Sequence, residues 1–353
     1  MIAKMNRNLI YGVTNAKPFP PGATRAWQRD RLVELGCTCV REGIDFANTW
    51  LGPNQYNWNA VSPDMGIGYK DAVQMSVDAG FEVIGLIATT PTWALPAAAT
   101  QHTENSEDDE RRIEHHKWPP AEEHAQAFID ACVACATEFN GLIRYWEFWN
   151  EENSLHGWHS DDPAEYTKWL IRMSDAVKSV NSDALVSVGG FDVAQDDDYL
   201  QGIRDAGGQS KYDAVSIHPY GDYRSDLPWD TDPSGTNRTI QGTRNNMLNN
   251  NDGAKSIWIT EYDWRIKNVG DSEATQAHRL ETAIREMRKE SRNYVTVATW
   301  LALTDINNTS MTGGLISLDL NKRAAFYKFK DLATSSDLSI PSGTVRAPVI
   351  QRV

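Results

Sequence analysis

Two short apolar segments of this sequence each end in a glutamate, and together these glutamates suggest a specific chemistry. Residues 145–153 read YWEFWNEEN, an aromatic strand that ends in Asn150 and Glu151. Residues 256–262 read SIWITEY, a second apolar strand that ends near Glu261. A carboxylate is costly to bury without partners, so one placed where a buried strand leaves the core has either partners or a task. A lone glutamate there would be read as solvated. Two of them, on different strands of one sheet, are the minimum equipment for glycoside hydrolysis.

The elements that must position these residues follow a regular alternation along the chain. Strands are predicted at residues 9–13, 37–44, 81–88, 145–149, 184–188, 213–217, 257–260 and 295–301. Helices are predicted at residues 23–35, 68–79, 119–139, 163–180, 195–206, 239–249 and 322–334, with a further one, capped by Asp271 or Ser272, that runs to Met287. Eight strands alternating with eight helices over short connections are typical of a (β/α)8 TIM barrel, an α/β fold. We expect a single barrel domain over residues 1–335 and an irregular tail over residues 336–353.

In this fold the active site lies at the C-terminal ends of the strands. The residues expected at those ends are polar or aromatic, whereas the strand bodies are apolar. They are Arg41, Trp93, Asn150, Glu151, His218, Tyr220, Glu261 and Trp300. Each has a structural explanation when taken alone: Arg41 as a barrel salt bridge, His218 as a hydrogen-bonded core histidine, Trp300 as packing. Gathered on one rim, they predict a site there.

The composition narrows the class of partner. The chain has 353 residues, of which 41% are hydrophobic and 23% charged, as expected for a globular protein with a sizeable core. Its formal net charge of −14 argues against binding to nucleic acid or to an anionic membrane, and fits a neutral or cationic substrate better than a polyanion. Its 13 Trp and 12 Tyr suit stacking against sugar rings. No apolar run is long enough to cross a membrane. No signal peptide is visible in this sequence, and the cellular compartment stays open. The sequence does not indicate an oligomeric state.

Two groups of residues raise the alternative of a metal site. The four cysteines are Cys37, Cys39, Cys132 and Cys135. A four-thiolate site needs ligands that converge from loops, whereas these positions fall on a strand and a helix, so we favour buried structural thiols. Three histidines, His102, His115 and His116, fall in the polar segment 100–118. They keep no metal-ligand spacing, which favours a solvated insertion loop.

Three segments carry a resemblance to a known group of enzymes. Residues 145–151, residues 215–221 (VSIHPYG) and residues 257–261 (IWITE) resemble the strand-four, strand-six and strand-seven signatures of clan A retaining glycoside hydrolases. The similarity is closest to family 39 and its relatives, with family 5 as a neighbour, and it extends from Leu9 to about Leu332.

The resemblance implies a role for each matching residue. Glu151 matches the general acid/base, Asn150 the group that binds the sugar 2-hydroxyl, and Glu261 the nucleophile. His218 and Tyr220 match groups that contact substrate or orient the nucleophile. The remaining matches are Trp300, as the aromatic floor of the cleavage subsite, and Arg41, as a support for the nucleophile. The implied chemistry requires no metal and no organic cofactor.

This sequence departs from the family pattern at two positions. Relatives commonly have Pro after the acid/base glutamate, and here the residue is Glu152. Glu151 is still favoured as the acid/base because it directly follows Asn150. Asp263 stands before Trp264 where a Gly is common, which could alter the rim of the substrate cleft.

The expected substrate is a carbohydrate, and the tryptophans bear on its length. We expect about half of five tryptophans on the strand-end loops to face solvent: Trp50, Trp93, Trp158, Trp264 and Trp300. A row of exposed rings favours an endo-acting enzyme on a neutral or weakly charged β-linked polysaccharide. The alternatives are an exo-acting β-xylosidase-like enzyme and a catalytically silent carbohydrate-binding barrel. A metal-dependent barrel hydrolase is disfavoured because the first strand has no His-x-His pair. A retaining enzyme predicts carboxyl groups about 5–5.5 Å apart at Glu151 and Glu261.

Overall fold

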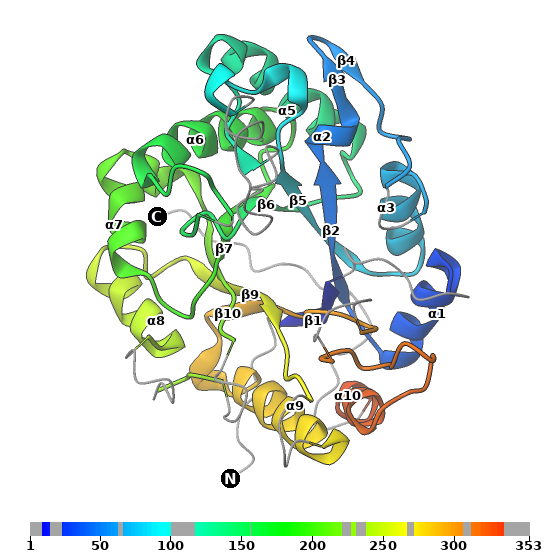
Figure 1. The fold of residues 1–353 in the computed structure, drawn as a ribbon. Helices are drawn as coiled ribbons and strands as arrows, with labels where there is room; N and C mark the ends of the chain where they lie inside the picture. The colour runs from blue at the N-terminus through cyan, green and yellow to red at the C-terminus, as the bar shows by residue number, and fades with distance from the viewer. Residues whose placement is uncertain are drawn as a thin grey trace.

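The structure, a computed structural model, describes residues 9–14, 23–62, 66–99, 117–155, 157–220, 227–230, 238–266, 272–305 and 312–334. Eight parallel strands close into a barrel in the order β1-β10-β9-β8-β7-β6-β5-β2. Figure 1 shows the strands at the centre of the molecule with the helices around them. They are β1 Ile10–Thr14, β2 Cys39–Asp45, β5 Glu82–Ala88, β6 Tyr145–Asn150, β7 Leu185–Phe191, β8 Ala214–Ile217, β9 Ser256–Tyr262 and β10 Val295–Trp300. The predicted TIM barrel is confirmed. The tail and the three histidines of the polar segment lie outside the described residues.

Helices follow the strands and form the outer ring of the barrel (Figure 1). They are α1 Arg25–Leu35, α3 Tyr69–Asp78, α5 Ala125–Glu138, α6 Pro163–Val180, α7 Asp197–Asp205, α8 Ile240–Asn249, α9 Glu273–Met287 and α10 Ala324–Thr334. Local chemistry sets several of their ends. Gly36 ends α1 in the left-handed conformation that Gly tolerates best, with φ 75°. Asp162 caps α6 through the Ala164 amide, and Pro163 occupies the first turn.

Some local structure was not predicted from the sequence. A short helix α2 (Phe46–Thr49) and a hairpin of β3 (Trp50–Gly52) and β4 (Gln55–Tyr56) follow β2. Single 3-10 turns are η1 Thr92–Ala94, η4 Glu122–His124, η5 Gly208–Lys211 and η6 Glu290–Arg292. The helix expected from residue 119 begins at Ala125 instead, after η4. The eight strands of the barrel keep their predicted places.

The interior of the barrel changes from apolar to polar along the strands. One buried layer is apolar or aromatic and consists of Ile10, Cys39, Ile84, Tyr145, Ala214, Trp258 and Val297. Successive side chains of a strand point to opposite faces, so the next inward residue lies two positions further on. Five of these next positions are polar and buried: Arg41, Glu147, Ser216, Thr260 and Thr299. The polar layer therefore lies toward the C-terminal ends of the strands, where the site was predicted.

The four cysteines are all buried and free of disulfide bonds, as expected for buried thiols. Burial raises the pKa of the Cys39, Cys132 and Cys135 thiols well above the ordinary value, so they stay protonated and unreactive. Within the described part of the chain, no helix combines the length and the apolar character needed to cross a membrane.

Candidate active site

The two predicted glutamates come together at the C-terminal end of the barrel. Glu151 directly follows β6, and Glu261 is the sixth residue of β9. One carboxylate oxygen of each lies within 4.8 Å of the other. Carboxyl groups are about 5–5.5 Å apart in retaining glycosidases and about 6.5–9.5 Å apart in inverting ones. The side chains keep 23% and 11% of their surface exposed, respectively, so both remain open to a ligand. Their separation fits the retaining geometry.

Glu261 is held by two donors. Arg41 of β2 donates from Nη1 to Glu261 Oε1 at 2.7 Å, and the Tyr220 hydroxyl donates to Oε2. Burial lowers the pKa of Arg41, but the carboxylates of Glu147 and Glu261 raise it by more, so the guanidinium stays charged. Burial and the Glu261 carboxylate raise the pKa of Tyr220 well above its usual value, so its phenol keeps its proton. Because Arg41 stays charged and Tyr220 keeps its proton, both remain hydrogen-bond donors to Glu261. Hydrogen bonds of this kind favour the ionised form of the carboxyl group.

Glu151 interacts with His218, which follows β8. Nδ1 of His218 lies 2.9 Å from Glu151 Oε1, and its Nε2 lies 3.2 Å from the Thr260 hydroxyl. Burial lowers the pKa of this fully buried imidazole, but the charges of Glu261 and Glu151 and the hydrogen bond to Glu151 raise it by more. The net effect is a raised pKa for His218. Its Nδ1 lies 3.9 Å from Glu261 Oε2, so of the two glutamates only Glu151 is within hydrogen-bond distance of the ring.

The backbone around Glu151 is strained. Trp149 and Glu151 both adopt left-handed conformations, with φ of 70° and 55°. Such conformations cost non-glycine residues about 1–2 kcal/mol each. The Glu151 amide donates to the Gly190 carbonyl at 3.0 Å, which anchors the turn to β7. Strain of this kind persists only where the surrounding structure enforces it, and it gathers at functional sites.

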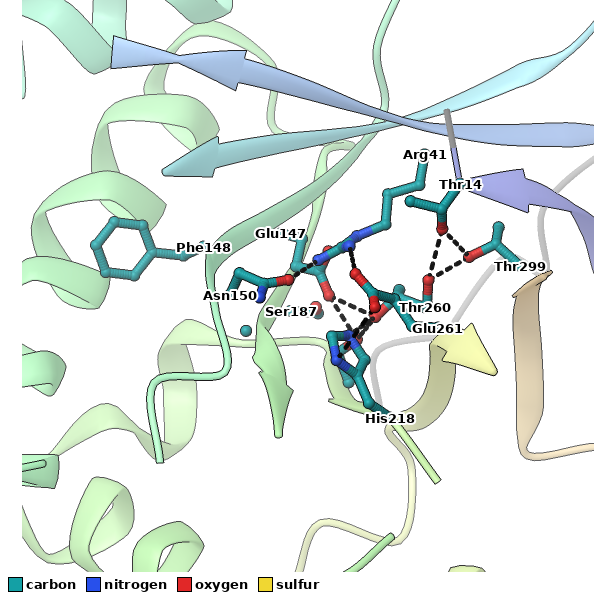
Figure 2. A network of polar contacts seen from close by, with 12 residues as sticks. Thr14, Arg41, Glu147, Phe148, Asn150, Ser187, His218, Thr260, Glu261 and Thr299 are labelled. Carbon is teal, nitrogen blue, oxygen red and sulfur yellow. Dashed lines mark hydrogen bonds and ion pairs between the residues drawn. The ribbon is translucent and has the colours of Figure 1, made fainter. Parts of the chain in front are cut away.

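Arg41 links Glu261 to two further residues (Figure 2). Its Nη2 donates to Asn150 Oδ1 at 2.8 Å, and its Nε donates to Glu147. Because a guanidinium can only donate, it takes the amide oxygen of Asn150 and turns the amide NH2 away from itself. Asn150 therefore presents a donor beside Glu151, as binding of a sugar hydroxyl would need.

Glu147 was not predicted to belong to the site. It is fully buried, and besides Arg41 it accepts from Ser216 Oγ at 2.6 Å and Thr260 Oγ1 at 2.8 Å. Figure 2 shows Glu147 directed toward Arg41 and Phe148 directed the opposite way. The available signal was the alternation of β6, because residue 147 shares the inward face of Tyr145. The Glu147 carboxylate therefore holds the Arg41 guanidinium in position.

Of the two consecutive glutamates, Glu151 rather than Glu152 shares the site with Glu261. Glu152 is fully buried, and its carboxylate oxygens make no hydrogen bond of good geometry among the described residues, although the Tyr166 hydroxyl and the Gly189 amide lie close enough to lower its pKa in part. A Cβ added to Gly189 would lie 2.1 Å from its Oε2, so this carboxyl lies against β7. Burial raises the pKa of Glu152 well above its usual value, and the neighbouring Glu147 raises it further. We infer that Glu152 is a neutral acid, buried behind the turn that carries Glu151.

The expectation that about half of the five tryptophans face solvent is wrong. Four are buried: Trp50, Trp158, Trp264 and Trp300. Only Trp93, of the five, is partly exposed. The buried rings pack against other aromatic rings, such as Trp264 against Trp300 with centroids 5.5 Å apart. The Trp300 indole donates to the Gly313 carbonyl at 2.9 Å, and its 0% exposure leaves no open ring face to serve as a sugar-binding floor. These tryptophans were expected to be exposed because they lie on loops, but they are buried because they pack against other aromatic rings.

Asp263, the second departure from the family pattern, is also buried, with 6% of its surface exposed. Its carboxylate lies 3.3 Å from Arg265 Nε. An added Cβ on Gly313 would lie 2.3 Å from Asp263 Oδ2, so this side chain packs against the segment that receives the Trp300 indole.

For a metal ion, the described residues offer one group of converging ligand atoms. Glu151, His218 and Glu261 each place one such atom within 4.8 Å of the others. The same side chains are engaged with one another, and the charged Arg41 bonded to Glu261 opposes a second cation there. The donor set suits an acid–base pair better than a metal centre.

Comparisons with known proteins place the chain among glycoside hydrolases. The family model described as cellulase (glycosyl hydrolase family 5) matches residues 29–304, well over half of the chain. No curated protein sequence matches it.

Solved structures share the barrel at low sequence identity. A family 39 glycoside hydrolase from the gut symbiont Bacteroides cellulosilyticus WH2 is 18% identical, with a TM-score of 0.67 over 94% of this chain and 64% of that one. A monomeric β-xylosidase from Caulobacter crescentus CB15 is 15% identical, with a TM-score of 0.67 over 94% of this chain and 69% of that one. An exo-β-1,4-mannosidase from Opitutaceae bacterium strain TAV5 is 14% identical, with a TM-score of 0.57 over 91% and 59%. These likenesses concern the fold, and the chain spans less than two thirds of the first enzyme.

Proposed function

The chain belongs to the cellulase family, glycosyl hydrolase family 5, and is a glycoside hydrolase, and we propose that Glu151 and Glu261 are its catalytic pair in a retaining double displacement. The observation that carries the proposal is the distance between them: one oxygen of each carboxylate lies within 4.8 Å of the other. Inverting enzymes keep their carboxyl groups about 6.5–9.5 Å apart to admit a water molecule, so the short gap favours the retaining mechanism. The substrate is a β-linked carbohydrate.

The first step forms a covalent bond between enzyme and sugar. A carboxylate oxygen of Glu261 attacks the anomeric carbon while Glu151 transfers its proton to the glycosidic oxygen, and the leaving sugar departs as an alcohol. In the second step Glu151 takes a proton from a water molecule, whose oxygen attacks the anomeric carbon. The bond to Glu261 breaks, and its carboxylate is restored. Each carboxyl group ends in its starting state.

The surrounding residues support different charges on the two glutamates. Arg41 and Tyr220 both donate to Glu261, which favours the ionised nucleophile. His218 contacts Glu151 and is the group through which a proton can be shared at that side. Asn150 is proposed to bind the sugar 2-hydroxyl with the amide NH2 that Arg41 leaves free. Of the predicted aromatic contacts, Trp93 remains a proposed substrate contact because part of its surface is exposed.

The mode of attack on a polymer is proposed to be exo rather than endo. The endo expectation depended on a row of exposed tryptophans, and four of the five are buried. A β-xylosidase and an exo-β-1,4-mannosidase are among the structures that share the barrel, although at 15% and 14% identity they support the fold more than the activity. Incubation with a long β-linked polysaccharide should release monosaccharide with no early fall in viscosity. A rapid fall in viscosity would restore the endo interpretation.

Substitution at the two glutamates tests the chemistry. Glu151→Ala should lose most activity on substrates with poor leaving groups, because these need proton donation. Added azide should rescue both Glu151→Ala and Glu261→Ala, with β-glycosyl azide from the first and α-glycosyl azide from the second. Unchanged turnover by Glu261→Ala would contradict the mechanism.

A further inference from the structure

Gly43, in the middle of β2, faces an open space at the mouth of the barrel. Cys39 and Arg41 point into the barrel, so Gly43, two positions after Arg41, lies on the same inner face. A Cβ added to Gly43 would meet no heavy atom within 4 Å among the described residues. Gly43 is partly exposed, whereas its neighbours Glu42 and Ile44 are 1% and 0% exposed. The open side of this part of β2 is therefore its inner face.

The other glycines of the barrel strands face space that is already filled. They are Gly12, Gly85, Gly189 and Gly190. A Cβ added to any of these four would lie 3.0 Å or less from another atom. In front of Gly190 that atom is Nε2 of His218, at 2.0 Å, so the imidazole fills the mouth on the β7 side. We call the space in front of Gly43, on the β2 side, the Gly43 hollow.

The Gly43 hollow lies beside the groups that would hold the reacting sugar. Arg41, two residues earlier on the same strand, donates to Glu261 and to Asn150 (Figure 2). On the other side of the pair, His218 contacts Glu151 and fills the space before β7. The sugar that bonds to Glu261, the glycon, therefore has room to extend toward β2.

The order of the strands relates the hollow to one position of the sugar ring. In the proposed function the anomeric carbon lies at Glu151 and Glu261, and Asn150 of β6 binds the 2-hydroxyl. The ring oxygen and C2 flank the anomeric carbon, so the ring continues from C2 to C3 on the side away from the ring oxygen. From β6 the neighbouring strands on that side are β5 and then β2. The substituent on C3 is therefore the one that points to the Gly43 hollow.

The strand positions around the hollow carry no polar side chain. Leu86 of β5 is the register partner of Gly43, and it lies two positions after Ile84 of the inner apolar layer. Leu86 is 8% exposed, and Ala88, the next inward position of β5, is partly exposed. The hollow therefore has a wall of carbon atoms.

The nearest inward polar residue of β2 is already engaged. Asp45 follows Gly43 by two positions, and its Oδ1 accepts from the Ala47 amide at 3.0 Å and from the Thr89 hydroxyl. Its Oδ2 accepts from Asn48 Nδ2. Both carboxylate oxygens are thus used to hold the start of α2 and the end of β5.

We propose that the Gly43 hollow receives a small apolar substituent on the 3-hydroxyl of the glycon, such as a methyl ether or an acetyl ester, and that Gly43 determines this specificity. The proposal rests on the proposed function, because Glu151, Glu261 and Asn150 define how the ring lies. A free 3-hydroxyl would exchange water for carbon atoms there, whereas a methyl group is stabilised by leaving water. A side chain at position 43 would take the same space.

Aryl β-glycosides of glucose, xylose and mannose, each with and without a 3-O-methyl group, test the proposal. For the sugar that wild type prefers, the ether should have a kcat/KM about 4-fold above that of its parent, as burial of one methyl group predicts. Gly43→Val should lower kcat/KM for the ether by ~10–200-fold and for the parent by less than ~3-fold, because valine fills the space that the methyl group needs.

The substitution itself should leave the fold intact. Gly43 is not among the residues with positive φ, so valine can adopt its backbone conformation, and β-branched residues favour strands. Denaturant titration should show no loss of stability. The control Ile44→Val alters the next residue of β2, which faces away from the barrel interior and is 0% exposed. Its ratio of ether to parent kcat/KM should equal that of wild type.

Three results would each overturn the proposal. They are rejection of the 3-O-methyl ether by wild type, an equal loss for ether and parent in Gly43→Val, and a loss in that variant confined to the 4-O-methyl ether. Binding of the same glycosides to Glu261→Ala, measured by calorimetry, repeats the comparison without turnover. An ether that binds no better than its parent there, or fails to bind, would also contradict the proposal. Absence of hydrolysis by wild type would instead contradict the proposed function.

Discussion

Two buried ion-pair clusters begin at neighbouring residues of β2 and extend to opposite sides of the strand. Arg41 points into the barrel and binds Glu147, Glu261 and Asn150. Glu42 points outward and binds Arg25 of α1, which also donates to Gln28 and Ser76.

Burial does not distinguish the two clusters. The Arg25 and Glu42 side chains are 5% and 1% exposed, and Arg41 and Glu147 are 2% and 0% exposed. The difference is where each cluster ends. The outer cluster joins α1, β2 and α3 and ends in buried groups, whereas the inner one ends at Glu261 and Asn150, which retain exposed surface. In this protein a buried network of charges therefore indicates function only where it extends to a side chain that is exposed to a ligand.

The largest effect should come from the open end of the inner cluster. Glu261→Ala should reduce kcat on an aryl β-glycoside by at least ~10⁴-fold, because the covalent intermediate cannot form. Steady-state rates at saturating substrate measure it. The matched control Glu123→Ala alters an exposed glutamate on the turn before α5 and should keep full activity.

Replacing the two arginines tests the comparison directly. Arg41→Met should lower the free energy of unfolding by about 3–5 kcal/mol, because Glu147 loses its buried counter-ion. It should also lower kcat/KM by ~10²-fold or more, because Glu261 loses a preorganised donor. Arg25→Met should destabilise by a similar amount.

The second arginine variant should differ from the first in catalysis. For the folded fraction of Arg25→Met, kcat/KM should stay near wild type. Denaturant titration gives the stabilities, and rates corrected for folded protein give the activities. A ~10²-fold loss of activity in folded Arg25→Met would erase the distinction between the clusters.

A smaller, pH-dependent effect is expected at Glu152, which is as fully buried as Glu147 but has different neighbours. Glu147 is satisfied by Arg41 and two hydroxyls, whereas the pKa of Glu152 is raised and the donors near its carboxylate, the Tyr166 hydroxyl and the Gly189 amide, are uncharged. An acid with a raised folded pKa binds its proton more tightly when folded, so stability falls as pH rises above the unfolded pKa of about 4.3. Glu152→Gln should match wild type near pH 4 and gain on it with rising pH, by about 2–4 °C in Tm per kcal/mol. If the difference in Tm between Glu152→Gln and wild type were the same near pH 4 and at higher pH, the assignment of Glu152 as a neutral acid would be contradicted.

The smallest effect is expected at Ser216, one of three donors to Glu147. Ser216→Ala should cost about 1 kcal/mol of stability, because Arg41 and Thr260 still satisfy the carboxylate. The kcat should change less than about 3-fold. A loss as large as that of Arg41→Met would mean that Glu147 is positioned by the hydroxyl rather than by the guanidinium.

Features set by residues close together in the chain were predicted from the sequence, and features set by distant residues were not. The eight strands and the ends of most helices were predicted, because alternation, apolar periodicity and caps such as Asp162 act within a few residues. The hairpin after β2 was missed because its strands are only three and two residues long. Exposure of the tryptophans was misjudged because it depends on which rings meet, as Trp264 meets Trp300.

By itself the sequence determined the barrel and the two glutamates that meet at its rim, since parallel strands bring all their C-terminal ends to one edge. Only the tertiary structure distinguished Glu147, Glu151 and Glu152, which lie within six residues of one another. Glu147 is paired with Arg41 inside the barrel, Glu151 is open to a ligand, and Glu152 is buried beside β7. Those states depend on partners far away in the chain, such as Arg41, 106 residues from Glu147 and 220 from Glu261. The charge of a carboxyl group is set by its surroundings, and these are assembled only when the barrel closes.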